Sequence, residues 1–177
     1  MPETLSSEHI YKGRIFDVRI DTVRDGELEY KREIISHKGS AVIVPVFEDG
    51  TVALVRQYRH AAGRQMLELP AGTLDAGDES PETGARRELE EEIGVIAENI
   101  EKMAEFYVSP GFLDEKMFVY LATGLTETAQ NLDDDEVVEI VRLPLTEAAQ
   151  MARDGRIEDA KTIIGLIFAA QSVAKSE

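Results

Sequence analysis

Residues 72–95 read GTLDAGDESPETGARRELEEEIGV, and in them a loop rich in glycine and aspartate runs into an acidic helix. Ser80 followed by Pro81 predicts the start of this helix, because a serine hydroxyl caps a first turn and proline fits its first position. Gly94 predicts its end, because glycine readily adopts the left-handed conformation that closes a helix. The stretch therefore predicts a helix over residues 82–93, and the rest of the fold is arranged around it.

Three glutamates share one face of the predicted helix. Glu88, Glu91 and Glu92 stand three and four residues apart, so an α-helix gathers their carboxylates. Like charges at this spacing destabilise a helix by about 0.2–0.5 kcal/mol per pair. One interpretation is a solvated acidic face whose negative charge is partly offset by Arg86 and Arg87. A site for a hard cation is the other, because Mg2+ takes oxygen ligands.

The spacing of residues 79–95 resembles the Nudix box. Glu79 is followed, after seven residues, by RELEEEIGV (residues 87–95), which matches that half of the family pattern at each position. The other half departs from it, because the loop between Gly72 and Glu79 is one residue longer than in the family. This leaves both Asp78 and Glu79 as candidates for the loop acid. On the match, the chain is identified as a member of the Nudix hydrolase family.

Composition limits the function. A chain of 177 residues predicts one domain with room for a small appendage. The absence of cysteine excludes disulfides, thiolate nucleophiles and cysteine-based zinc sites. A net charge of −16 argues against nucleic acid and against an anionic membrane surface as partners. No apolar run reaches the length of a membrane span and no signal-peptide core is visible, so we expect a cytoplasmic protein.

The order of the predicted elements indicates an α/β fold. Residues 1–39 predict short strands joined by turns, and this N-terminal β segment is too small and polar to stand alone. Residues 40–177 then carry strands on both sides of the helix and further helices at the end, with a loop over residues 123–136. The predicted strands lie at 40–47, 51–56, 103–108, 116–122 and 137–145, and the final helices at 145–154 and 159–173. This layout resembles the Nudix α/β/α sandwich with a mixed sheet, with residues 40–177 as the Nudix domain.

Three further stretches are similar to the ADP-ribose pyrophosphatase branch of the family. They are VRQYRH leading to LELPAG, YVSPG around Pro110, and the C-terminal DGRIEDAKTIIGL. The resemblance implies Mg2+-dependent hydrolysis of the pyrophosphate bond of ADP-ribose or a related nucleoside diphosphate sugar, by a metal-activated water. It also implies a homodimer, which the segment 1–39 would form.

The same resemblance assigns the metal ligands. Glu88 and Glu92 are expected as the principal ligands of Mg2+, with Mn2+ as the alternative ion. Glu91 is expected as an auxiliary ligand, and the backbone carbonyl of Ala71 completes the set. Arg87 is expected to bond one of these carboxylates and orient it. Its alternative interpretation is an ordinary surface arginine on a helix.

The general base has to come from elsewhere, because metal would occupy the carboxylates of the helix. The branch carries it on a loop well after the box, where this chain has DDDEVVEI. We expect Glu136 in this role, with Glu139 and Asp135 as alternatives. A loop base has a physical advantage, because closure over the substrate positions it and excludes water in one step. A solvated acidic loop is the competing interpretation.

Substrate-binding residues are also carried over from the branch. Arg59 is expected at the substrate phosphates, where a guanidinium suits oxyanions. Arg32 is expected to reach the nucleotide of a partner subunit, Glu115 to accept from a ribose hydroxyl, and Pro110 to mark the binding loop. Surface ion pairs are the alternative for Arg32 and Glu115. With no tryptophan in the chain, a base would stack on an aromatic side chain such as Phe16 or Tyr30.

Two other functions stay open at this point. A non-catalytic Nudix module could bind a nucleotide sugar as a sensor, although such a module would be expected to lose box carboxylates that are all present here. A Nudix hydrolase of other substrates, such as GDP-mannose or dinucleoside polyphosphates, is the second. Spacing does not distinguish them, because specificity depends on the geometry of loops.

Overall fold

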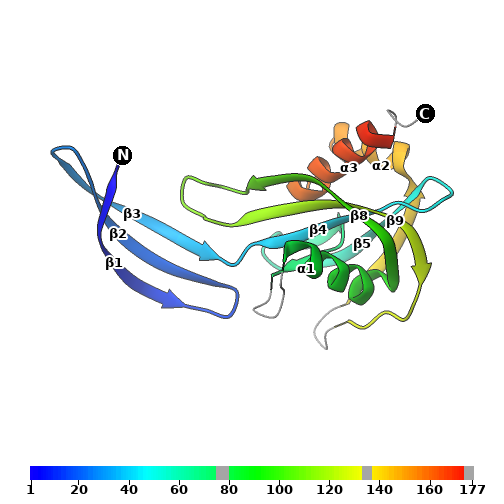
Figure 1. The fold of residues 1–177 in the computed structure, drawn as a ribbon, viewed down its shortest axis with the longest axis horizontal. Coiled ribbons are helices and arrows are strands. Elements are labelled where there is room, and N and C mark those ends of the chain that lie inside the picture. Colours follow the sequence, from blue (N-terminus) through cyan, green and yellow to red (C-terminus); the bar gives the residue numbers. More distant parts are fainter. Residues whose placement is uncertain (75–79, 133–136, 174–177) are drawn as a thin grey trace.

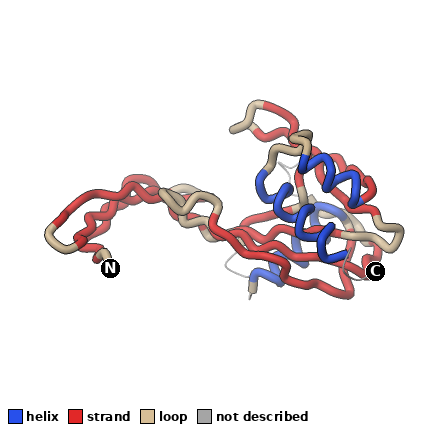
Figure 2. The backbone as a smooth tube through the Cα atoms, turned by 90° about the horizontal axis from the view of Figure 1, so that it is seen from above, coloured by secondary structure: helices blue, strands red, loops and turns tan. Residues whose placement is uncertain are grey.

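The structure is a computed structural model that describes residues 1–74, 80–132 and 137–173. A three-stranded N-terminal sheet projects from a body made of two further sheets and the helices (Figures 1 and 2). None of the helices in these ranges is long and apolar enough to cross a membrane.

The N-terminal sheet contains β1 (Glu3–Lys12), β2 (Phe16–Asp25) and β3 (Leu28–His37), which pair antiparallel in chain order. One of the turns predicted within residues 1–39 lies at Asp25-Gly26, where Gly26 has a φ of 63° and β2 reverses into β3. Every residue of β1 is exposed, so this sheet contributes little to the core of the chain.

The sheet is tied to the body through β3. The backbone of Ile35 donates a hydrogen bond to Phe112 O (2.7 Å) and accepts one from Asp114 N (3.0 Å). The side chain of Asp114 accepts from the backbone of His37 (2.7 Å) and pairs with Arg19 (3.5 Å). These contacts hold the loop that contains Pro110 against the N-terminal sheet.

The body has one mixed and one antiparallel sheet. In the mixed sheet the order is β7-β4-β9-β8, with β4 and β9 parallel. In the other sheet the order is β10-β5-β6. The strands of the body are β4 (Ser40–Pro45), β5 (Thr51–Arg59), β6 (Arg64–Glu68), β7 (Ala71–Thr73), β8 (Val95–Tyr107), β9 (Lys116–Glu127) and β10 (Glu139–Pro144).

The prediction of a loop from residue 123 was wrong. Strand β9 continues to Glu127, because β8 begins directly after the box helix and its first residue, Val95, pairs with Glu127. Strands β6 and β7 were also not predicted from the segment between 57 and 72. Both are short, and they form only because β5 and β4 offer them an edge for pairing.

The predicted box helix is present, with a change of pitch along it. Residues Pro81–Glu88 form α1, whose first turn is capped by the hydroxyl of Ser80 accepting from Thr83 N (3.2 Å). Residues Leu89–Ile93 continue it as a π-helix, η1, which ends at Gly94 with a φ of 69°. The other helices are α2 (Leu145–Arg153) and α3 (Ala160–Val173).

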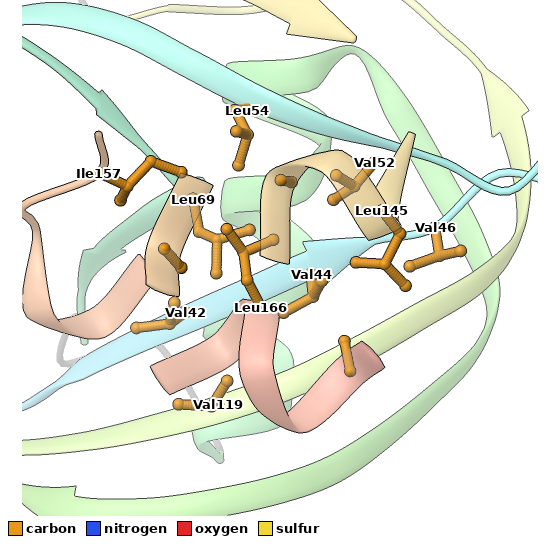
Figure 3. Close-up of a cluster of buried hydrophobic side chains, with 13 residues drawn as sticks. Val42, Val44, Val46, Val52, Leu54, Leu69, Val119, Leu145, Ile157 and Leu166 are labelled. Atoms are coloured by element: carbon orange, nitrogen blue, oxygen red, sulfur yellow. The ribbon is translucent and has the colours of Figure 1, made fainter. Parts of the chain in front are cut away.

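Strand β4 lies between the two helix layers of the body, and each of its residues is buried. Ala41 and Ile43 belong to the apolar cluster beneath α1 and η1. Val42 and Val44 belong to the cluster beneath α2 and α3, together with Leu166 (Figure 3). Burial on both faces explains why the strand reads as an uninterrupted apolar run. The predicted α/β/α sandwich with a mixed sheet is confirmed.

Helix α3 approaches the sheets closely at Gly165. A Cβ added there would lie 2.5 Å from Leu69 Cδ1 and 3.2 Å from Val44 Cγ2. We therefore expect Gly165→Val to lower the free energy of unfolding by about 1–3 kcal/mol, measured by urea denaturation, because it overpacks the core. Gln171→Val adds the same kind of side chain on the exposed side of α3 and should change stability much less. Equal effects of the two variants would contradict this packing.

Candidate functional site

A cleft of about 780 Å³ opens beside the C-terminal half of the box helix. It brings together residues from β5, from β7, from the box helix and from the turns next to the N-terminal sheet. The lining residues are Arg14, Ile15, Lys38, Gln57, Tyr58, Arg59, Ala71, Gly72, Thr73, Arg87, Glu88, Glu91 and Val137. Cations and carboxylates therefore face the same space, although the chain as a whole is strongly acidic.

Two of the box glutamates are buried beside β7. Glu88 is 8% exposed and Glu92 is 3% exposed, which is rare for carboxylates unless they are paired. Glu92 Oε2 accepts a hydrogen bond from Ala71 N (3.2 Å). The carboxylate of Glu88 lies against Gly72 so closely that any Cβ at position 72 would overlap it. The glycine thus makes room for an acid at the floor of the cleft.

Arg87 connects the carboxylates of its own helix. Its Nη1 donates to Glu88 Oε1 (2.7 Å) and to Glu91 Oε2 (2.8 Å), and its Nη2 donates to the carbonyl oxygen of Thr73 (3.3 Å). One guanidinium thus offsets part of the repulsion between two carboxylates and orients both. It also links the helix to β7.

Arg59 enters the cleft from the end of β5, held by a buried acid. Its Nε and Nη2 each donate to the carboxylate of Glu68 at 2.8 Å. Lys161, on α3, donates to the same carboxylate at 2.5 Å. Burial works to raise the pKa of Glu68, but the hydrogen bond from Arg59 and the charge of Lys161 outweigh it and lower this pKa. The hydrogen bond to Glu68 in turn raises the pKa of Arg59.

The donor set in the cleft has the chemistry that a hard cation requires. Glu88 and Glu91 line the cleft and offer carboxylate oxygens, and the buried Glu92 lies beside them at Ala71. Gly72 leaves the space in which Glu88 approaches the backbone. Within the described ranges, no three acidic or histidine side chains already converge as a metal-binding cluster. The predicted loop acids Asp78 and Glu79 lie outside those ranges.

Other predicted residues lie away from the cleft. Arg32 is on the exposed part of β3, with its guanidinium 4.1 Å from the ring centre of Tyr30. Pro110 lines a separate cavity of about 250 Å³, together with Arg19 and Asp114. The structure therefore does not bring Arg32 or Pro110 to the box helix within one chain.

Glu115 and Phe16 also have neighbours outside the cleft. Glu115 accepts a hydrogen bond from Ser40 Oγ (2.9 Å) and lies 3.6 Å from His37 Nδ1. Phe16 packs near Tyr11, with 5.8 Å between the ring centres. Neither side chain lines the cleft beside the box helix.

The predicted base lies beyond what the structure describes. Glu136 and its alternative Asp135 fall between the described ranges 80–132 and 137–173. The other alternative, Glu139, is exposed on β10, 3.8 Å from Arg56. Val137, which directly follows Glu136, lines the cleft.

Sequence reasoning missed several residues of the site. Arg14 and Tyr58 reach the cleft through tertiary packing, and no local pattern indicated this. Glu68 and Lys161 did leave a signal. Glu68 interrupts the apolar LEL of residues 67–69, and Lys161 stands four residues before Gly165 on the buried stripe of α3. A charged residue in an apolar pattern predicts a buried partner of opposite charge.

Comparisons with known proteins agree with this geometry. The family model of the NUDIX domain matches residues 37–164. A methanol dehydrogenase activator of Bacillus methanolicus is 39% identical over 94% of this chain and 91% of its own length. An ADP-ribose pyrophosphatase of Bacillus subtilis (strain 168) is 38% identical over the same shares. The crystal structure of an ADP compounds hydrolase has a TM-score of 0.86 at 23% identity, over 99% of this chain and 95% of that one.

The family model covers well over half of the chain, and both relatives exceed 30% identity over nearly all of it. The chain therefore belongs to the NUDIX family. The structural match at 23% identity independently supports the fold.

The pairing of Glu68 predicts a measurable loss of stability. We expect Glu68→Gln to lower the free energy of unfolding by about 3 kcal/mol, because it removes the nearer of the two carboxylates that the buried Lys161 pairs with, Glu68 and Asp159. Since the folded state lowers the pKa of Glu68, its contribution is full above the unfolded pKa of about 4.3 and is lost as the pH falls through the folded value. Urea denaturation at several pH values measures both effects.

The matched control is Glu29→Gln, which removes an exposed pair with Arg24 on the N-terminal sheet. It should leave the urea midpoint unchanged. A Glu68→Gln variant as stable as the wild type, or one that loses as much stability in acid as the wild type, would contradict the assignment.

Proposed function

We propose that this chain hydrolyses the pyrophosphate bond of ADP-ribose or a related nucleoside diphosphate sugar. Water adds to one phosphorus, the bridging P–O bond breaks, and the products are a nucleoside monophosphate and a sugar phosphate. The observation that carries the proposal is the cleft in which Arg59 and Arg87 face Glu88 and Glu91, because it combines oxyanion binding with cation binding. The similarity to an ADP-ribose pyrophosphatase over nearly the whole chain supports it.

The cation would be held by the box helix. Nudix hydrolases generally use divalent metals, and we propose Mg2+, with Mn2+ as the alternative. Glu88 and Glu92 would be the principal ligands, with Glu91 as an auxiliary and the carbonyl of Ala71 completing the set. When bound, such a cation neutralises phosphate oxygens and lowers the pKa of a water molecule. The position of Glu88 against Gly72, of Glu91 beside Arg87 and of Glu92 beside Ala71 supports these roles for the glutamates.

The remaining residues would bind and orient. Arg87 would keep the carboxylates of Glu88 and Glu91 in fixed directions, which its two short hydrogen bonds support. Arg59 would bind the diphosphate, because its guanidinium lines the cleft. Glu136 stays our choice for the general base, and the position of its neighbour Val137 at the cleft supports it.

The activity is tested by incubating the protein with Mg2+ and ADP-ribose, GDP-mannose, a dinucleoside polyphosphate and nucleoside triphosphates, and identifying the products. We expect AMP and ribose 5-phosphate from ADP-ribose. Glu92→Gln should lower kcat/KM by about 100-fold or more, because stabilisation of charge by a metal contributes several kcal/mol. The matched control is Glu90→Gln, which makes the same change on the exposed side of the box helix.

A different preferred substrate would reassign the specificity within the family. Binding of ADP-ribose without turnover of any substrate would replace the proposal with a nucleotide-sugar sensor. Equal activity of Glu92→Gln and Glu90→Gln would remove Glu92 from the metal site.

We also propose that residues 1–39 form a homodimer. The N-terminal sheet projects from the body (Figure 2). It exposes large apolar side chains that a second copy would cover. The exposed residues include Ile10, Tyr11, Phe16 and Leu28. In such a dimer, Arg32 would reach the nucleotide in the partner's cleft, and Glu115 and Pro110 would contribute to the same binding region. The cytoplasm stays the location we expect.

Analytical ultracentrifugation tests the assembly. We expect a dimer for the wild type and a monomer for Ile10→Glu, because a charge buried in an apolar interface is costly. Ile96→Glu places the same change at an exposed site on the body, 49% accessible, and should leave the dimer intact. A monomeric wild type would contradict the proposal, as would an Ile10→Glu variant that still forms the dimer.

A further inference from the structure

Three charged side chains from three elements form a row from the interior of the body to the cleft. Lys161 on α3 contacts Glu68 on β6, and Glu68 contacts Arg59 on β5. The side chains of Lys161 and Glu68 are only 9% and 2% exposed, whereas that of Arg59 is 42% exposed. Only the last member reaches the space that a ligand would enter. The two inner members can therefore affect a ligand only through Arg59.

The burial of Lys161, at the inner end of the row, needs an explanation other than the stability of the fold. Burying a lysine requires removing its ammonium group from water, which the pairs with Glu68 (2.5 Å) and Asp159 (3.0 Å) offset. Replacing a buried ion pair by apolar residues is often neutral or stabilising. Stability alone therefore does not favour a lysine at this position of α3, whereas orientation of a neighbouring charge does.

The hydrogen bonds at Glu68 show that the guanidinium of Arg59 is the group that is oriented. Its two oxygens each accept one donor of Arg59 at 2.8 Å, Nε on one and Nη2 on the other, so the plane of the guanidinium is fixed. Lys161 shares the oxygen that accepts from Nη2. The last torsion of a glutamate is otherwise broad, so this third donor restricts the rotation of the carboxylate. In the described parts of the chain, Nη1 of Arg59 donates no hydrogen bond, which leaves its two hydrogens for a ligand.

A second connection fixes α3 to the same strand end. The hydroxyl of Thr162 accepts from the backbone of Leu69 (2.7 Å) and donates to Asp159 Oδ2 (2.6 Å). Leu69 directly follows Glu68, so the first turn of α3 contacts both the side chain and the backbone at this point. Two separate contacts, one to the side chain of Glu68 and one to the backbone of Leu69, therefore fix the position of Lys161 relative to Glu68.

We propose that Lys161 is a positioning residue that acts through Glu68 to hold the guanidinium of Arg59 in the orientation that binds the diphosphate of the substrate. The inference rests on the proposed function in one respect, that the group bound by Arg59 is a diphosphate. The fixed orientation of Arg59 itself is a property of the protein without a ligand.

The kinetic test compares Lys161→Met, Arg59→Ala and the double variant on ADP-ribose with Mg2+. Methionine keeps the length of the lysine stem without its charge. We expect Lys161→Met to raise KM about tenfold with little change in kcat, because it weakens a charged hydrogen bond that forms equally in the ground and transition states. The double variant should have the KM of Arg59→Ala, because Lys161 has no effect once Arg59 is absent.

Leu166→Ala is the matched control for a merely structural effect. Leu166 is fully buried on the same helix and belongs to the apolar cluster, not to the charged row, so its truncation should lower the melting temperature without raising KM. Two outcomes would overturn the proposal. One is a KM of the double variant that exceeds that of Arg59→Ala by the full factor seen for Lys161→Met alone. The other is an equal rise in KM for Leu166→Ala.

A spectroscopic measurement separates this proposal from the proposed function. The Nε–H resonance of Arg59, assigned by its loss in Arg59→Ala, reports the hydrogen bond to Glu68 without substrate. We expect slow exchange with water in the wild type and in Leu166→Ala, and exchange about tenfold faster in Lys161→Met. If the wild type hydrolyses nothing, the proposed function fails, and this exchange rate still decides the role of Lys161. Unchanged exchange in Lys161→Met would overturn it.

Discussion

The candidate site depends on the contact between the box helix and β7. The carboxylate of Glu88 occupies the space that a side chain at Gly72 would fill, and Glu92 accepts a hydrogen bond from the preceding backbone amide, that of Ala71. Two buried acids are unfavourable unless polar groups meet them. Arg87 supplies that partner for Glu88 and Glu91, and so the helix, the strand and the acid cluster form one unit. The cleft exists because this unit forms one of its walls.

The interior of the body joins this unit to a second charged group. Strand β4 carries Ile43 into the cluster beneath the box helix and Val44 into the cluster beneath α3 (Figure 3). The two helix layers therefore pack on opposite faces of the same strand. The buried pair of Glu68 and Lys161 links the α3 layer to Arg59, which lines the cleft together with Arg87. Charges from both layers converge there on the space where a diphosphate would bind.

The N-terminal sheet adds features that one chain does not use fully. Its turns bring Arg14 to the cleft, while β3 holds the loop that precedes Glu115 through Asp114. Most of its surface is nonetheless exposed, including apolar side chains such as Ile10. A small sheet with little burial gains little stability by itself, which is the physical reason to expect a second copy against it.

Local sequence pattern determined the ends of the box helix, the buried strand β4 and the family to which the chain belongs. Ser80 and Gly94 marked the ends of the box helix, continuous apolar residues marked β4, and the spacing of Arg87 and Glu88 marked the family, because each signal depends on neighbours within one turn or one strand. The ends of β9, the short strands β6 and β7, and the partners of Glu68 depend on pairing between distant segments. The cleft residues Arg14 and Tyr58 also escaped prediction. Tertiary structure alone decided these, because which surfaces meet is set by packing of the whole chain and not by residue spacing.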